Sequence, residues 1–493
     1  MEEKNKSLEV GNIFRMSITD LTSEGSGVGR INNLAVFVDG ALPGETVEAK
    51  ITGIKKNYLT SKSEIIILPS EHRKIPFCPV FDKCGGCVLQ HMSYDYQLIY
   101  KTKKVRDAVE RISGIKDIKI NEIIGAEQNK GYRNKSQYFF DGNSGEISCG
   151  FFERKSHEVV NHDNCFIVSG IVNSLKNKFI QFVKENKISI YDESKHAGFL
   201  KSTMIRQAFG TNELMLVIIG AAHPGEKLKE SLENLPRYLM EKVPYLKSIY
   251  LAINTASGNY AVGDKIKHLW GSKFIVEKIG GLKFHISPDS FFQINTEQTK
   301  VLYNTIMEFA DLKGSEAVLD LFCGTGTIGL FMAKKTSMIF GIDIVKSAIN
   351  DATDNAQLNN IKNAEFVSGD AFEILSHYSL NNSIKGKDVI ENGYNNNDGN
   401  DNQSKNKSHI SSNIDVLVAD PPRNGLGEDL VNLISDLSIK KIIYVSCNPS
   451  TLARDIKSFH EKGYKVEQIQ PIDMFPHTEH VECVVLLTNV TSK

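Results

Sequence analysis

The C-terminal half of the chain alternates short apolar runs with longer amphipathic stretches. Apolar runs that end in glycine or polar turns predict strands at residues 317–322, 338–342, 414–419, 441–445 and 484–488. Because helical stretches separate these runs, the pattern predicts repeated β–α units and a doubly wound parallel sheet of the Rossmann-like α/β class. We expect this domain to span residues 285–493.

The first part of the chain has a different pattern. Between residues 5 and 68, apolar segments such as Leu34–Val38 and Thr46–Ile51 are separated by glycine-rich turns. Short strands with such turns predict a small β-barrel of the OB-like type, an architecture often used to bind RNA. The turns at Glu24–Arg30 and Leu42–Glu45 resemble those of the TRAM domain.

Two further segments complete the predicted organisation. Residues 75–280 mix strands and helices and contain a group of cysteines, and we expect a central α+β domain that binds RNA. Two of its stretches, Lys130–Lys135 and Phe151–Lys155, interleave aromatic and basic residues, a mixture suited to looped RNA. Residues 381–413 are dominated by Asn, Asp, Ser, Lys and Gly, and this composition predicts a disordered insert between two strands.

Composition and charge exclude some classes of protein but do not indicate a function. Apolar residues make up 41% and charged residues 24%, and no run reaches the roughly 18 apolar residues that a membrane span requires. The charged start, Met1–Val10, is not typical of a secretory signal, so we expect a cytoplasmic protein without a membrane partner, and a monomer. The net charge of −1 neither supports nor excludes RNA binding.

A candidate cofactor site follows the first predicted strand of the α/β domain. The stretch Val318–Gly329 reads as a strand, a glycine turn and a helix start, where a ligand can approach the backbone closely. About twenty residues later Asp343 ends the next strand and can accept hydrogen bonds from ribose hydroxyls, and Asp370 can contact an adenine edge. Asp320 at the strand end suits a cationic sulfonium better than a diphosphate, which favours S-adenosylmethionine over NAD.

Two strand ends and the start of a third carry candidate catalytic residues. Asp420 follows the strand 414–419, Cys447 follows the strand 441–445, and Glu482 precedes the last strand. Residues just past the carboxyl ends of parallel strands line one crevice. A cysteine that adds to C6 of uracil makes C5 able to attack the sulfonium methyl group, and a base must then remove the C5 proton. We assign these roles to Cys447 and Glu482, with Asp420 as the anchor for uracil N3–H.

This ordered set of motifs resembles the RNA uracil-5-methyltransferase family, specifically its bacterial 23S ribosomal RNA members. The resemblance covers nearly the whole chain apart from the insert, and it implies S-adenosylmethionine as methyl donor and RNA as substrate. It matches Cys447 to the nucleophile and Glu482 to the base, and it matches Gln293, Phe322, Asp343 and Asp420 to positions that contact the cofactor. Thr327 stands where the family often has Asn, and Asp343 where it commonly has Glu.

The cysteines at the start of the central domain suggest a metal site. Cys78, Cys84 and Cys87 lie in one segment, and Cys165 is a distant fourth thiol. Four thiolates suit either tetrahedral zinc or a [4Fe–4S] cluster, although zinc sites more often show two Cys-x2-Cys pairs. The family resemblance implies a [4Fe–4S] cluster on these four cysteines.

Four alternative functions are weighed against this prediction. Transfer RNA is a possible substrate in place of ribosomal RNA. An RNA cytosine-5-methyltransferase would carry a second cysteine in the motif at Asp420–Arg423, and a radical enzyme would carry Cys-x3-Cys-x2-Cys; the chain has neither. A non-catalytic RNA-binding or RNA-folding protein would not need Cys447.

Overall fold

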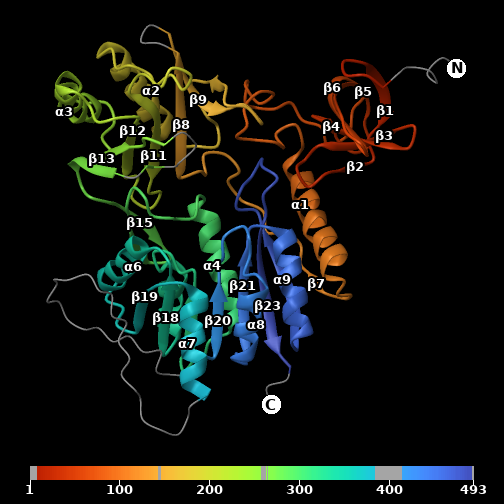
Figure 1. The fold of residues 1–493 in the computed structure, drawn as a ribbon, viewed down its shortest axis with the longest axis vertical. Coiled ribbons are helices and arrows are strands. Elements are labelled where there is room, and N and C mark those ends of the chain that lie inside the picture. The colour runs from red at the N-terminus through yellow and green to blue at the C-terminus, as the bar shows by residue number, and fades with distance from the viewer. Residues whose placement is uncertain (1–7, 143–145, 257–261, 264, 384–412, 491–493) are drawn as a thin grey trace.

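A computed structural model of the protein describes residues 8–142, 146–256, 262–263, 265–383 and 413–490. Three sheets of six, seven and eight strands and one two-stranded hairpin account for its strands. Figure 1 shows the N-terminal sheet and the central sheet on opposite sides of the upper half, with the C-terminal α/β unit below them. No helix in these ranges is long and apolar enough to cross a membrane.

The N-terminal sheet closes on a small core of its own. Its strand order is β1-β5-β6-β4-β3-β2. The strands are β1 (Ile13–Ser17), β2 (Asp20–Leu21), β3 (Gly27–Ile31), β4 (Leu34–Asp39), β5 (Thr46–Ile54) and β6 (Tyr58–Leu68). Alternate residues such as Val36, Val38, Val47 and Ala49 are fully buried inside it, as period-two patterning requires. The expected small β-barrel of the TRAM type is therefore the observed architecture.

The central sheet has the order β10-β9-β8-β11-β12-β13-β14. Its strands are β8 (Lys135–Gly142), β9 (Ile147–Phe152), β10 (Val159–Asn161), β11 (Leu200–Gln207), β12 (Leu214–Gly220), β13 (Leu246–Ile253) and β14 (Lys265–Gly271). Helices α2 (Gly170–Glu185) and α3 (Glu226–Met240) bury apolar side chains against one face. The hairpin of β15 (Ile275–Ile279) and β16 (Leu282–Ile286) packs into the core that this sheet shares with the C-terminal unit.

The C-terminal sheet has the order β19-β18-β17-β20-β21-β23-β22-β7. Its strands are β17 (Ala317–Leu321), β18 (Met338–Asp343), β19 (Ala364–Ser368), β20 (Val416–Ala419), β21 (Lys441–Ser446), β22 (Tyr464–Ile472), β23 (Glu482–Asn489) and β7 (Lys119–Ile120). The first five in this order are parallel, and β23 runs antiparallel between β21 and β22. Chain order reverses between β17 and β20, so this is the switch point at which such sheets bind ligands.

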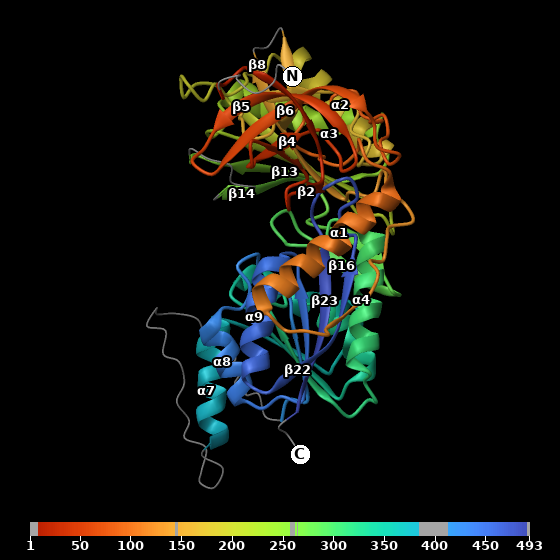
Figure 2. The same ribbon diagram turned by 90° about the vertical axis from the view of Figure 1, so that its right-hand side faces the viewer.

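Helices cover both faces of this sheet. On one face lie α4 (Thr296–Ala310), α5 (Thr327–Met332) and α6 (Lys346–Leu358). On the other lie α7 (Ala371–Ser383), α8 (Glu428–Asp436) and α9 (Pro449–Glu461). Figure 2 shows α1 (Tyr94–Ala108) crossing α9 on this second face, and Val105 and Val109 bury themselves there.

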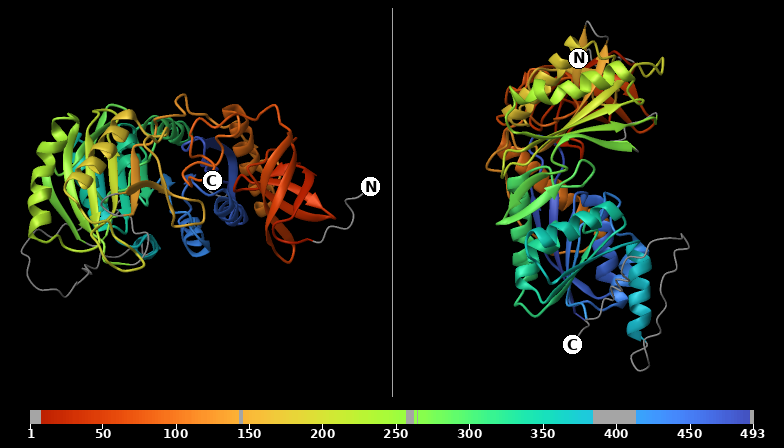
Figure 3. Two further views of the ribbon diagram at one scale, coloured as in Figure 1. Left: turned by 90° about the horizontal axis from the view of Figure 1, so that it is seen from above. Right: turned by 90° about the vertical axis from the view of Figure 1, so that its left-hand side faces the viewer.

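The boundaries differ from the predicted ones in two places. The range 75–280 was expected to form one central domain, but α1 and β7 pack against the C-terminal unit because their apolar residues are buried only there. Figure 3 shows the N-terminal, central and C-terminal parts of the chain from above and from the side. The predicted insert begins at residue 381, whereas α7 continues to Ser383, and residues 384–412 lie outside the described part of the chain.

Gly341 shows how tightly the cofactor-side strands pack. A Cβ added there would lie 2.3 Å from Cδ1 of Phe366 and 3.0 Å from Sγ of Cys323. We expect Gly341→Ala to lower the free energy of unfolding by about 1–3 kcal/mol, as overpacking of a dense core does. Urea unfolding followed by circular dichroism measures this loss. Gly170→Ala is the matched control, since an added Cβ there meets nothing within 4 Å; equal stability of the two variants would contradict the expectation.

Candidate active site

The structure brings the predicted strand-end residues to one edge of the C-terminal sheet. Asp420 follows β20, and its N–H donates to the carbonyl oxygen of Leu321 at the end of β17, 3.3 Å away. The side-chain amide of Gln293, which precedes α4, donates to Oδ2 of Asp420 at 3.3 Å. Cys447 follows β21, the next strand. These residues come from segments far apart in sequence, so only the parallel sheet explains their proximity.

The glycine turn after β17 presents its backbone to the same edge. Phe322 adopts a φ of 62°, which is uncommon for an aromatic residue and characteristic of functional turns. The N–H of Gly324 donates to Oδ2 of Asp343 at 2.9 Å, and the N–H of Val345 donates to Oδ1 at 2.8 Å. The turn therefore orients the carboxylate that was predicted to bind ribose.

Asp320 lies deeper than its position near a strand end suggests. It is completely buried, and its Oδ2 accepts a hydrogen bond of 2.9 Å from the N–H of Gly329 in α5. Its Oδ1 has no hydrogen-bond partner among the described residues. Burial, together with the nearby Asp420 and Asp343 carboxylates, raises the pKa of Asp320 to about 8. A buried acid with one unused oxygen can take a cationic group as its partner.

Two predicted cofactor contacts already have partners within the protein. The Thr327 hydroxyl, at the start of α5, accepts a hydrogen bond of 2.6 Å from the hydroxyl of Tyr303. Oδ1 of Asp370 accepts from the N–H groups of Phe372 and Glu373 at 2.9 and 3.1 Å and so caps α7. Their cofactor roles stay predictions, and each has a structural role as well.

Cys447 and Glu482, the predicted nucleophile and base, come from the neighbouring strands β21 and β23. Ser446 pairs with Cys483 in the ladder between β21 and β23, which places Cys447 beside Glu482 at the same sheet edge. Glu482 is 2% exposed, and its Oε1 has no hydrogen-bond partner in the described part of the protein. Burial and the Asp420 carboxylate raise the pKa of Glu482 well above its usual range.

The thiol of Cys447 is held in its protonated form by the same surroundings. Its pKa is raised to about 11 by partial burial and by the neighbouring Glu482 and Asp420 carboxyls. The guanidinium of Arg423 acts in the opposite direction. The thiolate is the reactive form of cysteine. A nucleophilic Cys447 therefore requires additional positive charge or removal of its proton when substrates bind.

Arg423 lies at the site, although sequence reasoning assigns it no role. Its Nη2 lies 3.3 Å from Nε2 of His480, and its carbonyl oxygen accepts from Asn448 and Thr451, each at 3.1 Å. These bonds join the segment after β20 to the segment that carries Cys447. Asn448 also caps α9, because its Oδ1 accepts from the N–H of Ser450. The backbone on both sides of the thiol is fixed.

The four predicted metal-binding cysteines line one small cavity. Cys78, Cys84, Cys87 and Cys165 surround it together with apolar side chains that include Phe81 and Ile167. Gly85 has to be small, since a Cβ there would lie 2.8 Å from the carbonyl oxygen of Phe152. No group of three or more His, Cys, Asp or Glu residues in the described ranges has the geometry to hold a metal ion.

The segments predicted to contact RNA also make contacts within the protein, while Lys130, Arg154 and Lys155 are exposed. The hydroxyl of Tyr132 donates to the carbonyl oxygen of Pro476 at 2.9 Å, and Arg154 donates to that of Cys87 at 2.7 Å. Lys130 lies 4.1 Å from the ring centroid of Phe77. A separate cavity of about 310 Å³ lies on the central sheet beside Phe152 and includes none of the predicted site residues.

Comparison with known proteins identifies the family. The model of the tRNA (uracil-5-)-methyltransferase family matches residues 273–490, and that of the TRAM domain matches residues 7–63. An uncharacterized RNA methyltransferase of Bacillus cereus is 38% identical over 99% of this chain and 98% of its own length. One of Caldanaerobacter subterraneus is 40% identical over 97% of this chain and 99% of its own.

A solved structure extends the likeness to the whole fold. The tRNA (uracil-54, C5)-methyltransferase of Pyrococcus abyssi, determined in complex with S-adenosyl-L-homocysteine, superposes with a TM-score of 0.71 at 27% identity. The match covers 96% of this chain and all of that one. The predicted family and Rossmann-like fold are confirmed. The chain belongs to the RNA uracil-5-methyltransferase family and is an S-adenosylmethionine-dependent RNA (uracil-5-)-methyltransferase.

Proposed function

We propose that the enzyme methylates C5 of a uridine in 23S ribosomal RNA through a covalent adduct between Cys447 and C6 of the base. The observation that carries this proposal is the placement of Cys447 beside two carboxyl groups, the half-buried Asp420 and the buried Glu482, next to the glycine turn. Transfer RNA is the second candidate substrate, because the similar Pyrococcus abyssi enzyme is named for a transfer RNA position.

The proposed reaction uses Cys447 first and Glu482 second. The Cys447 thiolate adds to C6, and the electron pair of the C5–C6 bond moves so that C5 can attack the methyl group of the sulfonium. The methyl–sulfur bond breaks and leaves a neutral thioether. Glu482 then takes the C5 proton, the C5–C6 double bond re-forms, and the carbon–sulfur bond to Cys447 breaks.

Asp420 supports this sequence by selecting the base. An ionised carboxylate accepts a hydrogen bond from uracil N3–H, whereas cytosine has an unprotonated N3 and cannot donate. Burial raises the pKa of Asp420 to about 6, and the amide of Gln293 donates to the carboxylate and favours its charged form. Asp420 is therefore mostly ionised at neutral pH.

The bound cofactor supplies the charge that the site lacks. Asp320, Asp420 and Glu482 are acids whose pKa values are all raised, which reflects negative charge in a region of low polarity. S-adenosylmethionine carries a sulfonium and an ammonium group. We infer that the unused Oδ1 of Asp320 favours these cations, while Phe322, Thr327, Asp343 and Asp370 serve the rest of the cofactor. The sulfonium also favours the thiolate of Cys447 over the thiol.

The covalent step is tested with RNA in which 5-fluorouracil replaces uracil. Fluorine cannot leave C5 as a cation, so the methylated adduct persists as a protein–RNA complex that resists denaturation. We expect wild-type enzyme to form this complex on 23S ribosomal RNA in the presence of S-adenosylmethionine, and Cys447→Ser to form none. Parallel reactions with transfer RNA distinguish the two substrates. Equal complex formation by both proteins would rule out the proposed nucleophile.

Asp320 gives the unliganded enzyme a specific pH dependence. Its folded pKa of about 8 lies above its ordinary value of 3.8, so its contribution to stability is complete below about pH 4 and is lost as the pH rises through 8. We expect the free energy of unfolding to fall with rising pH in this window by up to about 1.4 kcal/mol per pH unit more than in Asp320→Asn. Urea unfolding of both proteins at pH 5 and 8 measures this. Parallel profiles would refute the assignment.

We also propose that Cys78, Cys84, Cys87 and Cys165 hold a [4Fe–4S] cluster. Four thiolates suit either tetrahedral zinc or a [4Fe–4S] cluster, and these four cysteines line one small cavity. The family resemblance favours the cluster. Such a group would act structurally, since methyl transfer needs no electron.

A buried cation supports an anionic occupant of that cavity. The side chain of Lys176 is fully buried, and its Nζ donates to the carbonyl oxygen of Asp163 at 2.8 Å and to that of His162. Burial lowers the pKa of Lys176, whereas negative charge on Cys149, Cys165 and Asp163 would favour its charged form. A cluster with four thiolates would provide that charge.

The cluster is tested on protein purified without oxygen. We expect a brown protein with about four irons per chain, and a loss of this colour in Cys165→Ala. Metal analysis and the visible absorption spectrum provide the measurements. One zinc per chain without iron would contradict the proposal and leave the methyl-transfer proposal untouched.

A further inference from the structure

The segment that leads into Glu482 is an irregular loop that forms hydrogen bonds with several other parts of the chain. We define residues 473–481 as the strap. It connects the end of β22 to the start of β23, where Ile472 pairs with Glu482 in the last rung of the ladder. The last rung of a ladder is where local opening starts. Glu482 is a buried acid, and its carboxyl group would gain hydration if the end of the ladder opened. The position of Glu482 therefore depends on the contacts that hold the strap in place.

The main-chain carbonyl groups of the strap are bound by donors from outside it. Six of its nine carbonyl groups accept hydrogen bonds from four other parts of the chain. The pairs are Gln298 to Asp473, Asn295 to Met474, Lys101 to Phe475, Tyr132 to Pro476, Val88 and Leu89 to His477, and Lys104 to Glu479. An irregular segment satisfied in this way is as fixed as a strand.

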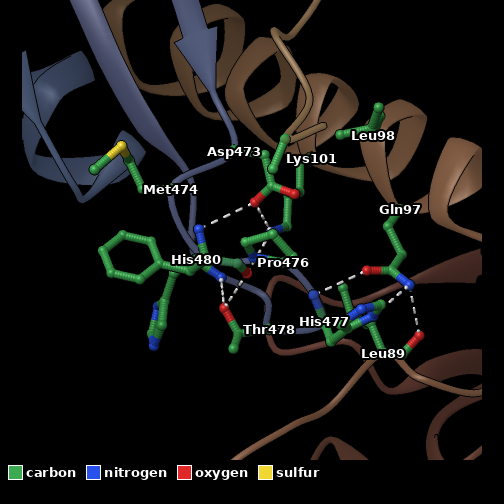
Figure 4. Close-up of polar contacts among 12 residues, drawn as sticks. Leu89, Gln97, Leu98, Lys101, Asp473, Met474, Pro476, His477, Thr478 and His480 are labelled. Atoms are coloured by element: carbon green, nitrogen blue, oxygen red, sulfur yellow. Dashed lines mark hydrogen bonds and ion pairs between the residues drawn. The ribbon is translucent and has the colours of Figure 1, made fainter. Parts of the chain in front are cut away.

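Helix α1 holds the first half of the strap by a buried ion pair. Nζ of Lys101 lies 2.6 Å from Oδ1 of Asp473, and both side chains are completely buried. The hydroxyl of Tyr94, also in α1, donates to Oδ2 of Asp473 at 2.8 Å. Figure 4 shows Lys101 reaching from α1 to the strap at Asp473. Removing either charge would leave the other buried and unpaired.

Gln97 joins the middle of the strap to the cysteine-containing segment. Its Oε1 accepts from the N–H of His477 at 3.1 Å, and its Nε2 donates to the carbonyl oxygens of Leu89 and Met92 at 3.0 and 2.9 Å. Figure 4 shows Gln97 between Leu89 and His477. Val88 and Leu89 directly follow Cys87, and both donate to the carbonyl oxygen of His477. The strap and the cysteine-containing segment therefore move together.

We propose that Gln97 and Lys101 are positioning residues for Glu482, and that α1 and the segment after Cys87 hold the strap so that the base stays at the active site. This inference rests on the proposed role of Glu482. The strap leads directly into Glu482, which acts in proton removal, whereas Cys447, which acts in methyl transfer, is held by β21 and α9. The two stages can therefore be affected separately. Loosening the strap should slow proton removal more than methyl transfer.

The test measures both stages in one reaction. The substrate is an RNA transcript, ribosomal or transfer RNA according to which the enzyme methylates, with tritium at C5 of uridine, and the S-adenosylmethionine carries a carbon-14 methyl group. In wild type, methyl incorporation and tritium release should rise together. In Gln97→Met, tritium release should lag by about tenfold, and ordinary RNA should accumulate as a methylated covalent complex with the enzyme.

A second variant and two controls make the outcome decisive. Lys101→Met/Asp473→Asn removes both charges of the buried pair and should show the same lag. Lys103→Met changes a lysine of the same helix that lies at the surface, where it pairs with Asp20 and Asp107. This variant should behave as wild type. Hydrogen exchange of the His477 amide should be faster in Gln97→Met, while thermal unfolding confirms that each variant is folded.

Glu482→Gln distinguishes failure of the inference from failure of the proposed function. It should accumulate the methylated complex without releasing tritium. If it does so while Gln97→Met releases tritium in step with methylation, or slows both stages equally, the strap does not position the base. If Glu482→Gln itself releases tritium normally, the proposed role of Glu482 is wrong.

Discussion

Acidic side chains enclosed at the carboxyl edge of the C-terminal sheet are the constraint on which the active site depends. Asp320, Asp420 and Glu482 lie among the strands and helices that also build the core, and the pKa of each is raised. Burial favours the neutral form of an acid, whereas a nearby cation favours its charged form. The sulfonium of S-adenosylmethionine is such a cation.

The same charge explains why the polypeptide around the site is anchored so heavily. A buried acid at the end of a ladder favours any opening that admits water. Two kinds of contact oppose such opening of the strap: hydrogen bonds to its carbonyl groups and the Lys101–Asp473 ion pair. Lys101 of α1 takes part in both. The N-terminal half of the chain thus holds a loop that leads into the predicted site of the C-terminal half.

That connection also suggests why the cysteines lie where they do. Cys87, which lines the cavity with Cys78, directly precedes Val88 and Leu89, whose N–H groups donate to the carbonyl oxygen of His477. A rigid group in this cavity would hold the backbone of Val88 and Leu89, and through it the strap. A group in this cavity could therefore affect the position of Glu482 without touching the reacting atoms, because backbone hydrogen bonds connect the cavity to the strap.

Local patterns in the sequence determined the fold class, the TRAM-like barrel, the cofactor turn and the order of the motifs, because each depends on residue spacing within one short stretch. The same patterns placed Cys447, Asp420 and Glu482 at strand ends. Only the tertiary structure showed that Asp320 is fully buried, that Asp370 caps a helix, and that α1 belongs to the C-terminal unit. The position of α1 depends on contacts between residues hundreds of positions apart, such as Lys101 with Asp473, and no local spacing encodes such a pair.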